Sequence, residues 1–346
     1  MFIQLEDGAA FKGKQFSGRK ESVGGKLMVF SAMIGHEEVM TDPSNLGRIL
    51  LFTYPLVGGY GMNFEDDQAE GPTISAFICR RAMDDATNFR SEMNLKEYLD
   101  YYDVLGIEEV DTRGLVRHLN ENGAQRAVIT ERLLTPSEME AFFAEQNPNT
   151  IEAVSTIEVT EIEGEGKTIA LWDFGVKDGI LEKLNDEGYR IIVYPAMTNY
   201  EDILKDNPDI LFLSSGPGFA AHYLDIVHDV GQMLGKLPIY GIGLGAEFLG
   251  LALGGVLQKL NKPHAGASIP VKGEEDRVYM TSQNHDYYIE NLPDSVAVTY
   301  THVGDGNVEG FWSREQKAYG VLFDPFGLPG ATDLLDEQLK QLKELA

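Results

Sequence analysis

The residues best placed to do chemistry form a run of alternating glycines at 240–246 (YGIGLGA). An apolar segment at 237–240 precedes it and is predicted as a short buried strand, and 246–253 (AEFLGLAL) is predicted as a packed helix. A strand, sharp turn and helix of this kind can hold one side chain in a strained, exposed position, as in a nucleophile elbow, with backbone N–H groups nearby as an oxyanion hole. The central residue, Gly243, has no side chain. The alternative interpretation is a glycine-rich strand–helix loop without catalytic meaning.

Other reactive side chains are few. Cys79 is the one cysteine, which excludes a disulfide framework and any cysteine-based metal site. It ends the apolar run 74–79, predicted as a buried strand, where an inert core thiol is expected. The seven histidines show no close pairing along the sequence, so no metal site is predicted.

Composition narrows the class of protein. A chain of 346 residues with 43% hydrophobic residues predicts two globular domains. The net charge of −27 leaves no basic stripe for a nucleic-acid backbone, so no nucleic-acid partner is expected. No apolar run approaches 18 residues, which argues against a membrane span. The first residues lack the basic start of a signal peptide, so a cytoplasmic location is expected.

The first half of the chain alternates short strands with turns and a few helices. Asp7-Gly8 predicts a hairpin between two short strands. Further strands are predicted at 27–30 and 49–54, and helices at 95–102, at 112–120 with Asp111 or Thr112 as cap, and from 135. This pattern predicts a β-rich α+β domain over 1–150.

The second half alternates strands and helices regularly. Strands are predicted at 168–172, 190–194, 210–213 and 239–240, and helices at 178–185, 200–205, 224–234, 246–253 and 333–345. Such alternation predicts a doubly wound parallel sheet, whose ligands bind at the carboxyl ends of the strands. The predicted α/β domain covers 167–346, and 151–166 is predicted as a linker.

Both halves carry motifs of one family in the family's own order. The matching runs are LEDG (5–8), TDPSN (41–45), FTYP (52–55), RSE (90–92), NLKEYL (94–99), VDTRGLVRHL (110–119), GAQRAVI (123–129), DFGVK (173–177), SSGPG (214–218), GIGLG (241–245), SQNH (282–285) and DGNVEG (305–310). The chain thus resembles the small subunit of carbamoyl-phosphate synthetase, with a C-terminal domain of the class I glutamine amidotransferase type. The resemblance implies an N-terminal interface with a large subunit.

The catalytic positions depart from that family's pattern. The resemblance places a cysteine nucleophile, a histidine base and an orienting glutamate at positions occupied here by Gly243, Asp324 and Phe326. No catalytic residue is therefore intact.

The pocket that binds glutamine in the family is only partly retained. Matching positions are Ser44, Gly216, Gly218, Leu244 and Asn284, whereas Glu247, Asp286 and Tyr287 replace other residue types. If Glu247, Asp286 and Asp324 all projected into this pocket, they would repel the carboxylate of glutamine and attract ammonium. The alternative is that these acids point into water. His264, His285 and His302 are expected to have hydrogen-bonded structural roles.

These residues predict a glutaminase-dead homologue that binds and activates a large subunit using free ammonia. Two alternatives remain: an active glutaminase using Ser214 or Ser215, and a repurposed small-molecule-binding or regulatory protein. No cofactor is expected for this chain, since ATP, bicarbonate and magnesium would belong to the large subunit. The sequence does not separate a role in arginine synthesis from one in pyrimidine synthesis.

Overall fold

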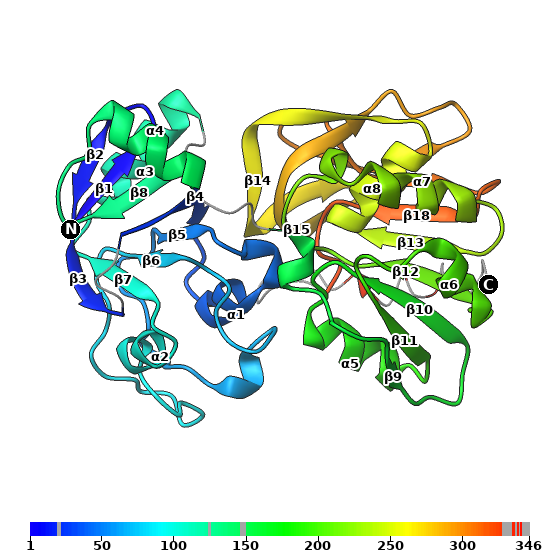
Figure 1. The fold of residues 1–346 in the computed structure, drawn as a ribbon, viewed down its shortest axis with the longest axis horizontal. Coiled ribbons are helices and arrows are strands. Elements are labelled where there is room, and N and C mark those ends of the chain that lie inside the picture. Colours follow the sequence, from blue (N-terminus) through cyan, green and yellow to red (C-terminus); the bar gives the residue numbers. More distant parts are fainter. Residues whose placement is uncertain are drawn as a thin grey trace. The chain divides into compact units, whose positions relative to one another are not determined.

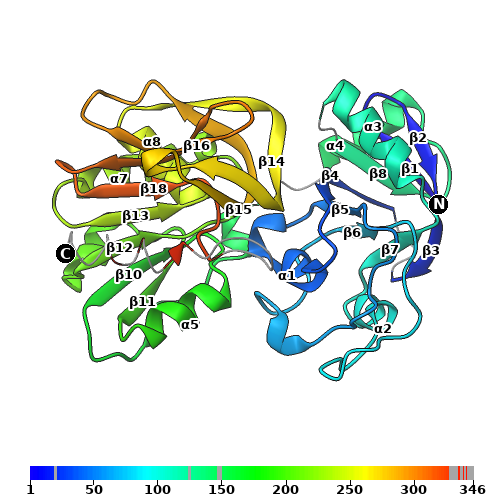
Figure 2. The same cartoon turned by 180° about the vertical axis from the view of Figure 1, so that it is seen from behind.

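The structure, a computed structural model, describes residues 1–18, 22–123, 126–145 and 150–326, together with 334, 335, 338 and 340. It divides into two compact units, Met1–Asn149 and Thr150–Ala346. Each unit is built on its own mixed sheet (Figures 1 and 2). None of the described helices is long and apolar enough to cross a membrane.

The first unit contains an eight-stranded sheet in the order β2-β1-β8-β4-β5-β6-β7-β3. Its strands are β1 (Phe2–Leu5), β2 (Ala10–Lys12), β3 (Lys14–Ser17), β4 (Val23–Phe30), β5 (Ile49–Phe52), β6 (Ala76–Ile78), β7 (Leu105–Glu108) and β8 (Arg126–Thr130). Its helical segments are α1 (His36–Thr41), η1 (Pro43–Asn45), η2 (Phe64–Asp66), α2 (Leu95–Tyr101), α3 (Thr112–Asn122) and α4 (Pro136–Glu145).

Local sequence signals explain several of these elements. The predicted hairpin forms, with β1 and β2 paired antiparallel. Asn94 and Glu97 make a reciprocal capping box that starts α2, and the Asp111 side chain caps α3 by accepting from Gly114 N at 3.0 Å. Cys79 is fully buried, and burial raises the pKa of its thiol, as expected for an inert core cysteine.

The second unit contains a ten-stranded sheet in the order β15-β14-β16-β17-β18-β13-β12-β10-β11-β9. Its strands are β9 (Thr160–Ile162), β10 (Thr168–Asp173), β11 (Arg190–Pro195), β12 (Ile210–Leu213), β13 (Ile239–Ile242), β14 (Val256–Lys272), β15 (Val278–Glu290), β16 (Ala297–His302), β17 (Val308–Ser313) and β18 (Ala318–Val321). Its helical segments are η3 (Ile151–Ala153), α5 (Asp178–Asp186), α6 (Tyr200–Lys205), η4 (Ala220–His222), α7 (Leu224–Met233), α8 (Leu244–Ala252) and η5 (Glu274–Asp276).

Strands β11, β10, β12, β13 and β18 run parallel in the middle of this sheet. Ile203, Val230 and Phe248, from helices α6, α7 and α8, share one buried cluster with one face of the sheet. Ile180 and Leu184 from α5 belong to the cluster on the other face. The predicted doubly wound domain is therefore confirmed, with strands β14–β17 as an antiparallel extension (Figure 1).

The predicted linker and the predicted C-terminal helix have different outcomes. Residues 151–166, predicted as a linker, contain η3 and β9, and β9 pairs antiparallel with β11, so this segment contributes an edge strand to the second sheet. The helix predicted at 333–345 lies mostly outside the described residues. Within it, Leu334 and Leu335 are buried in the cluster that contains α5.

Candidate functional site: a glycine elbow and its surroundings

The glycine run forms the sharp turn that the sequence predicts. Strand β13 ends at Ile242, α8 begins at Leu244, and Gly243 between them has φ 51° and ψ −117°. This is a conformation that residues with a side chain adopt only under strain. Gly243 N donates to Val321 O at 2.9 Å, and Glu247 N donates to Gly243 O at 3.0 Å, which fix the turn between β18 and α8. The backbone has the form of a nucleophile elbow.

The flanking glycines are required by close backbone approach. A Cβ on Gly241 would lie 2.7 Å from Gly245 O, and one on Gly245 would lie 2.3 Å from Leu213 O. Gly245 N donates to Ser214 O at 3.0 Å, which joins the start of α8 to the loop after β12. A Cβ on Gly243 would lie 2.7 Å from Ser215 Oγ. The Ser215 hydroxyl thus lies beside the space into which a nucleophile would project.

The DFGVK motif builds the loop that faces Asp324. The carboxylate of Asp173 accepts from Gly175 N and Val176 N, each at 2.8 Å, and from Thr156 N at 2.7 Å. These bonds shape the loop that leads to Lys177, the residue before α5. Lys177 Nζ lies 2.6 Å from Asp324 Oδ2, and the side chains of this pair are only 7% and 15% exposed.

Asp324 is held at both carboxylate oxygens. Oδ2 accepts from Lys177, and Oδ1 accepts from Phe326 N at 2.9 Å. Asp324 N donates to Ser282 O at 2.8 Å, which ties the segment to β15. Asp324, which the resemblance places at the family's base position, is therefore an ion-pair partner of Lys177, a residue to which the sequence assigned no role.

Glu247 is the second carboxylate expected near the elbow, and it does not point into water. Its exposed fraction is 5%, and its Oε2 has no hydrogen-bond partner among the described residues. Burial raises the pKa of Glu247 to about 8; nearby His285 acts against this rise and Asp286 adds to it. A carboxyl with this pKa is largely protonated at neutral pH. Glu247 therefore contributes little negative charge there.

The predicted group of three carboxylates is not a uniform anionic patch. Lys177 neutralises Asp324, and Glu247 is largely protonated at neutral pH. Asp286 follows His285 on β15, next to Tyr287, whose ring stacks on Phe219 with centroids 4.2 Å apart. The expectation that these acids all point into water is wrong for Glu247, which is buried, and for Asp324, whose carboxylate is paired with Lys177.

The remaining predicted positions lie on loops and strand ends. Gly216 approaches Phe174 O so closely that a Cβ would lie 2.1 Å away, and Gly218 has φ 107°. Leu244 is buried at the start of α8, and Asn284 lies on β15 opposite Ala265. Ser44 is buried in η1 of the first unit, where its N donates to Asp42 Oδ1 at 2.8 Å.

The three histidines form one connected group with two acids. We call His264, His285, His302, Asp305 and Glu309 the histidine cluster. His264 Nδ1 lies 2.7 Å from Glu309 Oε1, and His264 Nε2 lies 2.9 Å from Asp305 Oδ2. His285 Nε2 lies 3.2 Å from Glu309 Oε2, and His302 Nδ1 lies 2.9 Å from Asp305 Oδ1. The expectation of hydrogen-bonded histidines holds, but spacing along the sequence did not show that they meet.

Antiparallel pairing explains how these distant residues come together. His264 on β14 lies directly opposite His285 on β15, and the ring of His302, at the end of β16, stacks on His264 with centroids 3.9 Å apart. Burial, the largest single influence, acts to lower the pKa of His285. The charge and hydrogen bond of Glu309, the hydrogen bond to Tyr287 O and the charge of Glu247 together outweigh it and raise that pKa to about 9. His264 with His285 and Glu309, and His264 with His302 and Asp305, each offer three ligand atoms within 4.8 Å of one another.

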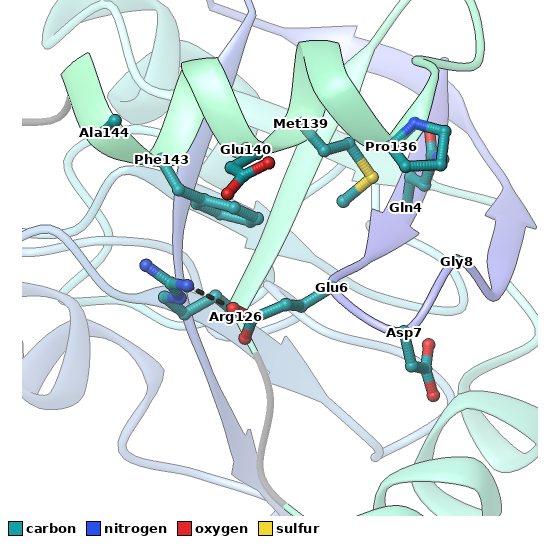
Figure 3. Close-up of a pocket in the computed structure, with 10 residues that line it drawn as sticks. All are labelled: Gln4, Glu6, Asp7, Gly8, Arg126, Pro136, Met139, Glu140, Phe143 and Ala144. Atoms are coloured by element: carbon teal, nitrogen blue, oxygen red, sulfur yellow. Dashed lines mark hydrogen bonds and ion pairs between the residues drawn. The ribbon is translucent and has the colours of Figure 1, made fainter.

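A separate hollow of about 570 Å³ lies in the first unit, between α4 and the β1–β2 hairpin (Figure 3). Glu6 and Arg126 form an ion pair there, and the Arg126 guanidinium lies 4.4 Å from the Phe143 ring. The residues that line it include none of the positions predicted for catalysis or for glutamine binding. This hollow is therefore distinct from the elbow and its pocket.

Each of the two units matches a known protein family. Residues 3–129 match the family of the carbamoyl-phosphate synthase small chain, CPSase domain, and residues 170–332 match the class I glutamine amidotransferase family. The second unit thus has the fold of a class I glutamine amidotransferase. A solved structure of a glutamine amidotransferase from Thermotoga maritima is also similar, with 16% identity and a TM-score of 0.39 over 51% of this chain and 84% of that one.

Curated relatives cover nearly the whole chain. The carbamoyl phosphate synthase small chain of Clostridium perfringens is 40% identical over 97% of both chains. That of Caldanaerobacter subterraneus is 38% identical over 97% of this chain and 93% of its own. The chain belongs to the carbamoyl-phosphate synthase small-chain family.

Proposed function

We propose that this chain is a glutaminase-dead small-chain homologue that acts as a structural and activating partner of a large subunit using free ammonia. The observation that carries the proposal is the elbow itself, whose backbone is formed while its central residue, Gly243, has no side chain. The conclusion rests on the correspondence between Gly243 and the nucleophile position of the family.

The chemistry of amide hydrolysis supports this proposal. The amidotransferase mechanism needs a nucleophile that forms an acyl-enzyme, a base that activates it and an acid that protonates the leaving ammonia. Gly243 supplies no nucleophile. Asp324 is bonded at both carboxylate oxygens, and Phe326 has no group that could orient a base. Loss of such a constellation costs on the order of 10⁴-fold or more in rate.

A serine nucleophile is the second candidate, and one observation favours it. Ser215 Oγ lies 2.7 Å from the place where a Cβ on Gly243 would be, so a hydroxyl is present beside the elbow. Ser214 is less suitable, because its fully buried Oγ accepts from Phe174 N at 2.8 Å and donates to Ser215 O at 2.9 Å. Both of these bonds engage backbone groups rather than a base.

The first unit supports a partner of the large-subunit type. It matches the small-chain family over 3–129, and the resemblance assigns the large-subunit interface mainly to this half. The synthetase reaction on ammonia would take place on the large subunit, with its own ATP, bicarbonate and magnesium. We place this assembly in the cytoplasm, in arginine or pyrimidine synthesis.

The test is to express the chain with a candidate large subunit and to measure carbamoyl phosphate formed from glutamine and from ammonium. The Clostridium perfringens small chain serves as the active reference. We expect co-purification, ammonium-dependent synthesis that increases when this chain is present, and glutamine hydrolysis at least about 10⁴-fold below the reference.

Two other results would support the alternative functions. Glutamine hydrolysis that disappears in Ser215→Ala would establish the serine alternative. Failure to bind any large subunit, together with no hydrolysis, would favour a repurposed small-molecule-binding or regulatory protein.

A further inference from the structure

The histidine cluster has an outer part that is open to solvent and an inner part that is closed. His264, His285 and Glu309 are buried, with Glu309 fully so. The side chain of Asp305 is 40% exposed and that of His302 is 15% exposed. Three ligand atoms of the outer part, from His264, His302 and Asp305, lie within 4.8 Å of one another. The outer part therefore combines convergent ligand atoms with an entry path.

The hydrogen-bond requirements of the outer part conflict. Both ring nitrogens of His264 face carboxylate oxygens, Nδ1 at 2.7 Å from Glu309 and Nε2 at 2.9 Å from Asp305. A neutral imidazole has only one N–H, so His264 can donate to both carboxylates only as an imidazolium with a proton on each nitrogen. His302 Nδ1 faces Asp305 Oδ1 at 2.9 Å and also accepts from Asp305 N at 3.2 Å. His302 Nδ1 would therefore have to donate one hydrogen bond and accept another.

A bound cation would replace the proton on His264 Nε2 and would remove the conflict at His302 Nδ1. The His264 and His302 rings now stack with centroids 3.9 Å apart, so the His302 ring would have to turn out of this stack. The lone pairs of His264 Nε2 and His302 Nδ1 and the Asp305 carboxylate would then point to the same positive charge. His302 Nδ1 would then need no proton. The separations of 2.9 Å are shorter than the roughly 3.3 Å between ligand atoms of a tetrahedral zinc site, so binding would require each side chain to move outward by a few tenths of an ångström.

The buried half of the cluster has the form of a supporting layer. Metal-binding histidines nearly always donate their second ring N–H to a carboxylate, a backbone carbonyl or a water molecule, which fixes the tautomer and the orientation of the ring. Glu309 Oε1 takes this place for His264 Nδ1. Glu309 is itself held by His285 Nε2 at 3.2 Å, and His285 Nδ1 lies 2.8 Å from Tyr287 O. Each member of this layer is therefore fixed by the next.

We propose that His264 Nε2, His302 Nδ1 and the Asp305 carboxylate bind a divalent transition-metal ion of the zinc type. Two imidazoles and one carboxylate suit zinc and its neighbours, whereas magnesium and calcium prefer sites made of oxygen atoms alone. Three protein ligands leave a fourth position open to water or to a ligand. The ion would join β14, the end of β16 and the turn before β17, and so hold the antiparallel extension together.

The experiment uses the full chain after treatment with a chelator. Zinc is titrated in competition with a chromogenic chelator, and cobalt(II) is added separately as a spectroscopic probe of coordination. We expect one zinc ion per chain, a rise in Tm with zinc, and the intense visible absorption of tetrahedral cobalt. Asp305→Asn and His302→Gln should each lower zinc affinity by at least about 10-fold to 100-fold, the range found when only a supporting residue is removed.

Matched variants separate this site from adventitious binding. His228→Gln removes an exposed histidine of α7 in the same unit and should leave zinc affinity unchanged. Melting curves without metal show whether the Asp305 and His302 variants are folded.

Two results would overturn the proposal: the absence of saturable one-to-one binding, and binding that folded Asp305→Asn and His302→Gln retain in full. Neither measurement involves glutamine or a large subunit. This inference and the proposed function can therefore fail independently of each other.

Discussion

The elbow at Gly243 and the histidine cluster lie in the same unit and show opposite relations between backbone and side chains. At the elbow, the main chain has the geometry of a reactive site, yet its central position has no reactive group. In the histidine cluster, ionisable groups converge with short contacts on an ordinary antiparallel sheet. A backbone shape is thus evidence for a scaffold, whereas the side chains it presents decide which chemistry is available.

The difference extends to charge. In the elbow region, the acid Asp324 forms an ion pair with the buried Lys177. In the cluster, each acid contacts two imidazoles, and these contacts link residues from separate strands and from the turn between them. Buried polar groups therefore hold segments in place in both regions, and variants can measure how strongly.

The largest effect on stability is expected at the Lys177–Asp324 pair. Lys177→Met leaves a buried carboxylate without its counter-charge, and we expect a loss of about 3–5 kcal/mol in the free energy of unfolding. The double variant Lys177→Met/Asp324→Leu should recover most of this loss, because no buried charge remains. Denaturant unfolding of the two single variants and the double variant gives the coupling energy.

The control for this pair is Lys96→Met, which breaks an exposed ion pair with Asp100 and should cost less than about 1 kcal/mol. If Lys96→Met and Lys177→Met caused equally small losses in the free energy of unfolding, the Lys177–Asp324 pair would not stabilise the elbow region. The elbow region would then differ from the histidine cluster more than we propose.

A smaller effect is expected from Gly243→Ala. The new Cβ would adopt φ 51° and lie 2.7 Å from Ser215 Oγ, which predicts a loss of about 1–3 kcal/mol. Gly231→Ala in α7 is the matched control, since a Cβ there meets nothing within 4 Å and should stabilise by roughly 0.5–1 kcal/mol. Thermal melts compare the two. If Gly243→Ala were neutral, the elbow could accept a side chain without strain.

The third prediction concerns Glu247, which lies near both regions. Its folded-state pKa of about 8 is above the ordinary value of 4.5, so its contribution to stability is complete below pH 4.5 and is lost as pH rises towards 8. Relative to Glu247→Gln, the wild type should lose stability across this window by at most about 1.4 kcal/mol per pH unit. Denaturant midpoints measured from pH 4.5 to 8 test this.

Glu182→Gln, at an exposed position of α5, is the control for the pH series and should keep the wild-type slope. A wild-type curve parallel to that of Glu247→Gln would show that Glu247 is ionised throughout.

Much of the fold follows from the sequence because its signals are local. Strand–helix alternation, the Asp7-Gly8 turn, the Asp111 cap and the glycine run each act within a few residues, and the structure contains all of them. The family motifs then indicate the fold of each unit.

The contacts of the candidate site are mostly long-range, and this is why sequence reasoning missed them. Lys177 and Asp324 are 147 positions apart, and no local pattern signals their pairing. The histidines meet through strand register, which spacing along the chain does not reveal. The DGNVEG run at 305–310 was a usable signal, since it contains Asp305 and Glu309, which both contact His264.

The Ser215 hydroxyl beside Gly243 has a consequence for anyone who tries to install amidase activity in this protein. A cysteine introduced at 243 alone would bring its Cβ to 2.7 Å from that oxygen, so Ser215 would have to shift. Under the proposed function, installing that activity would need changes at 215, 243, 324 and 326 together, with Lys177 given a new counter-ion.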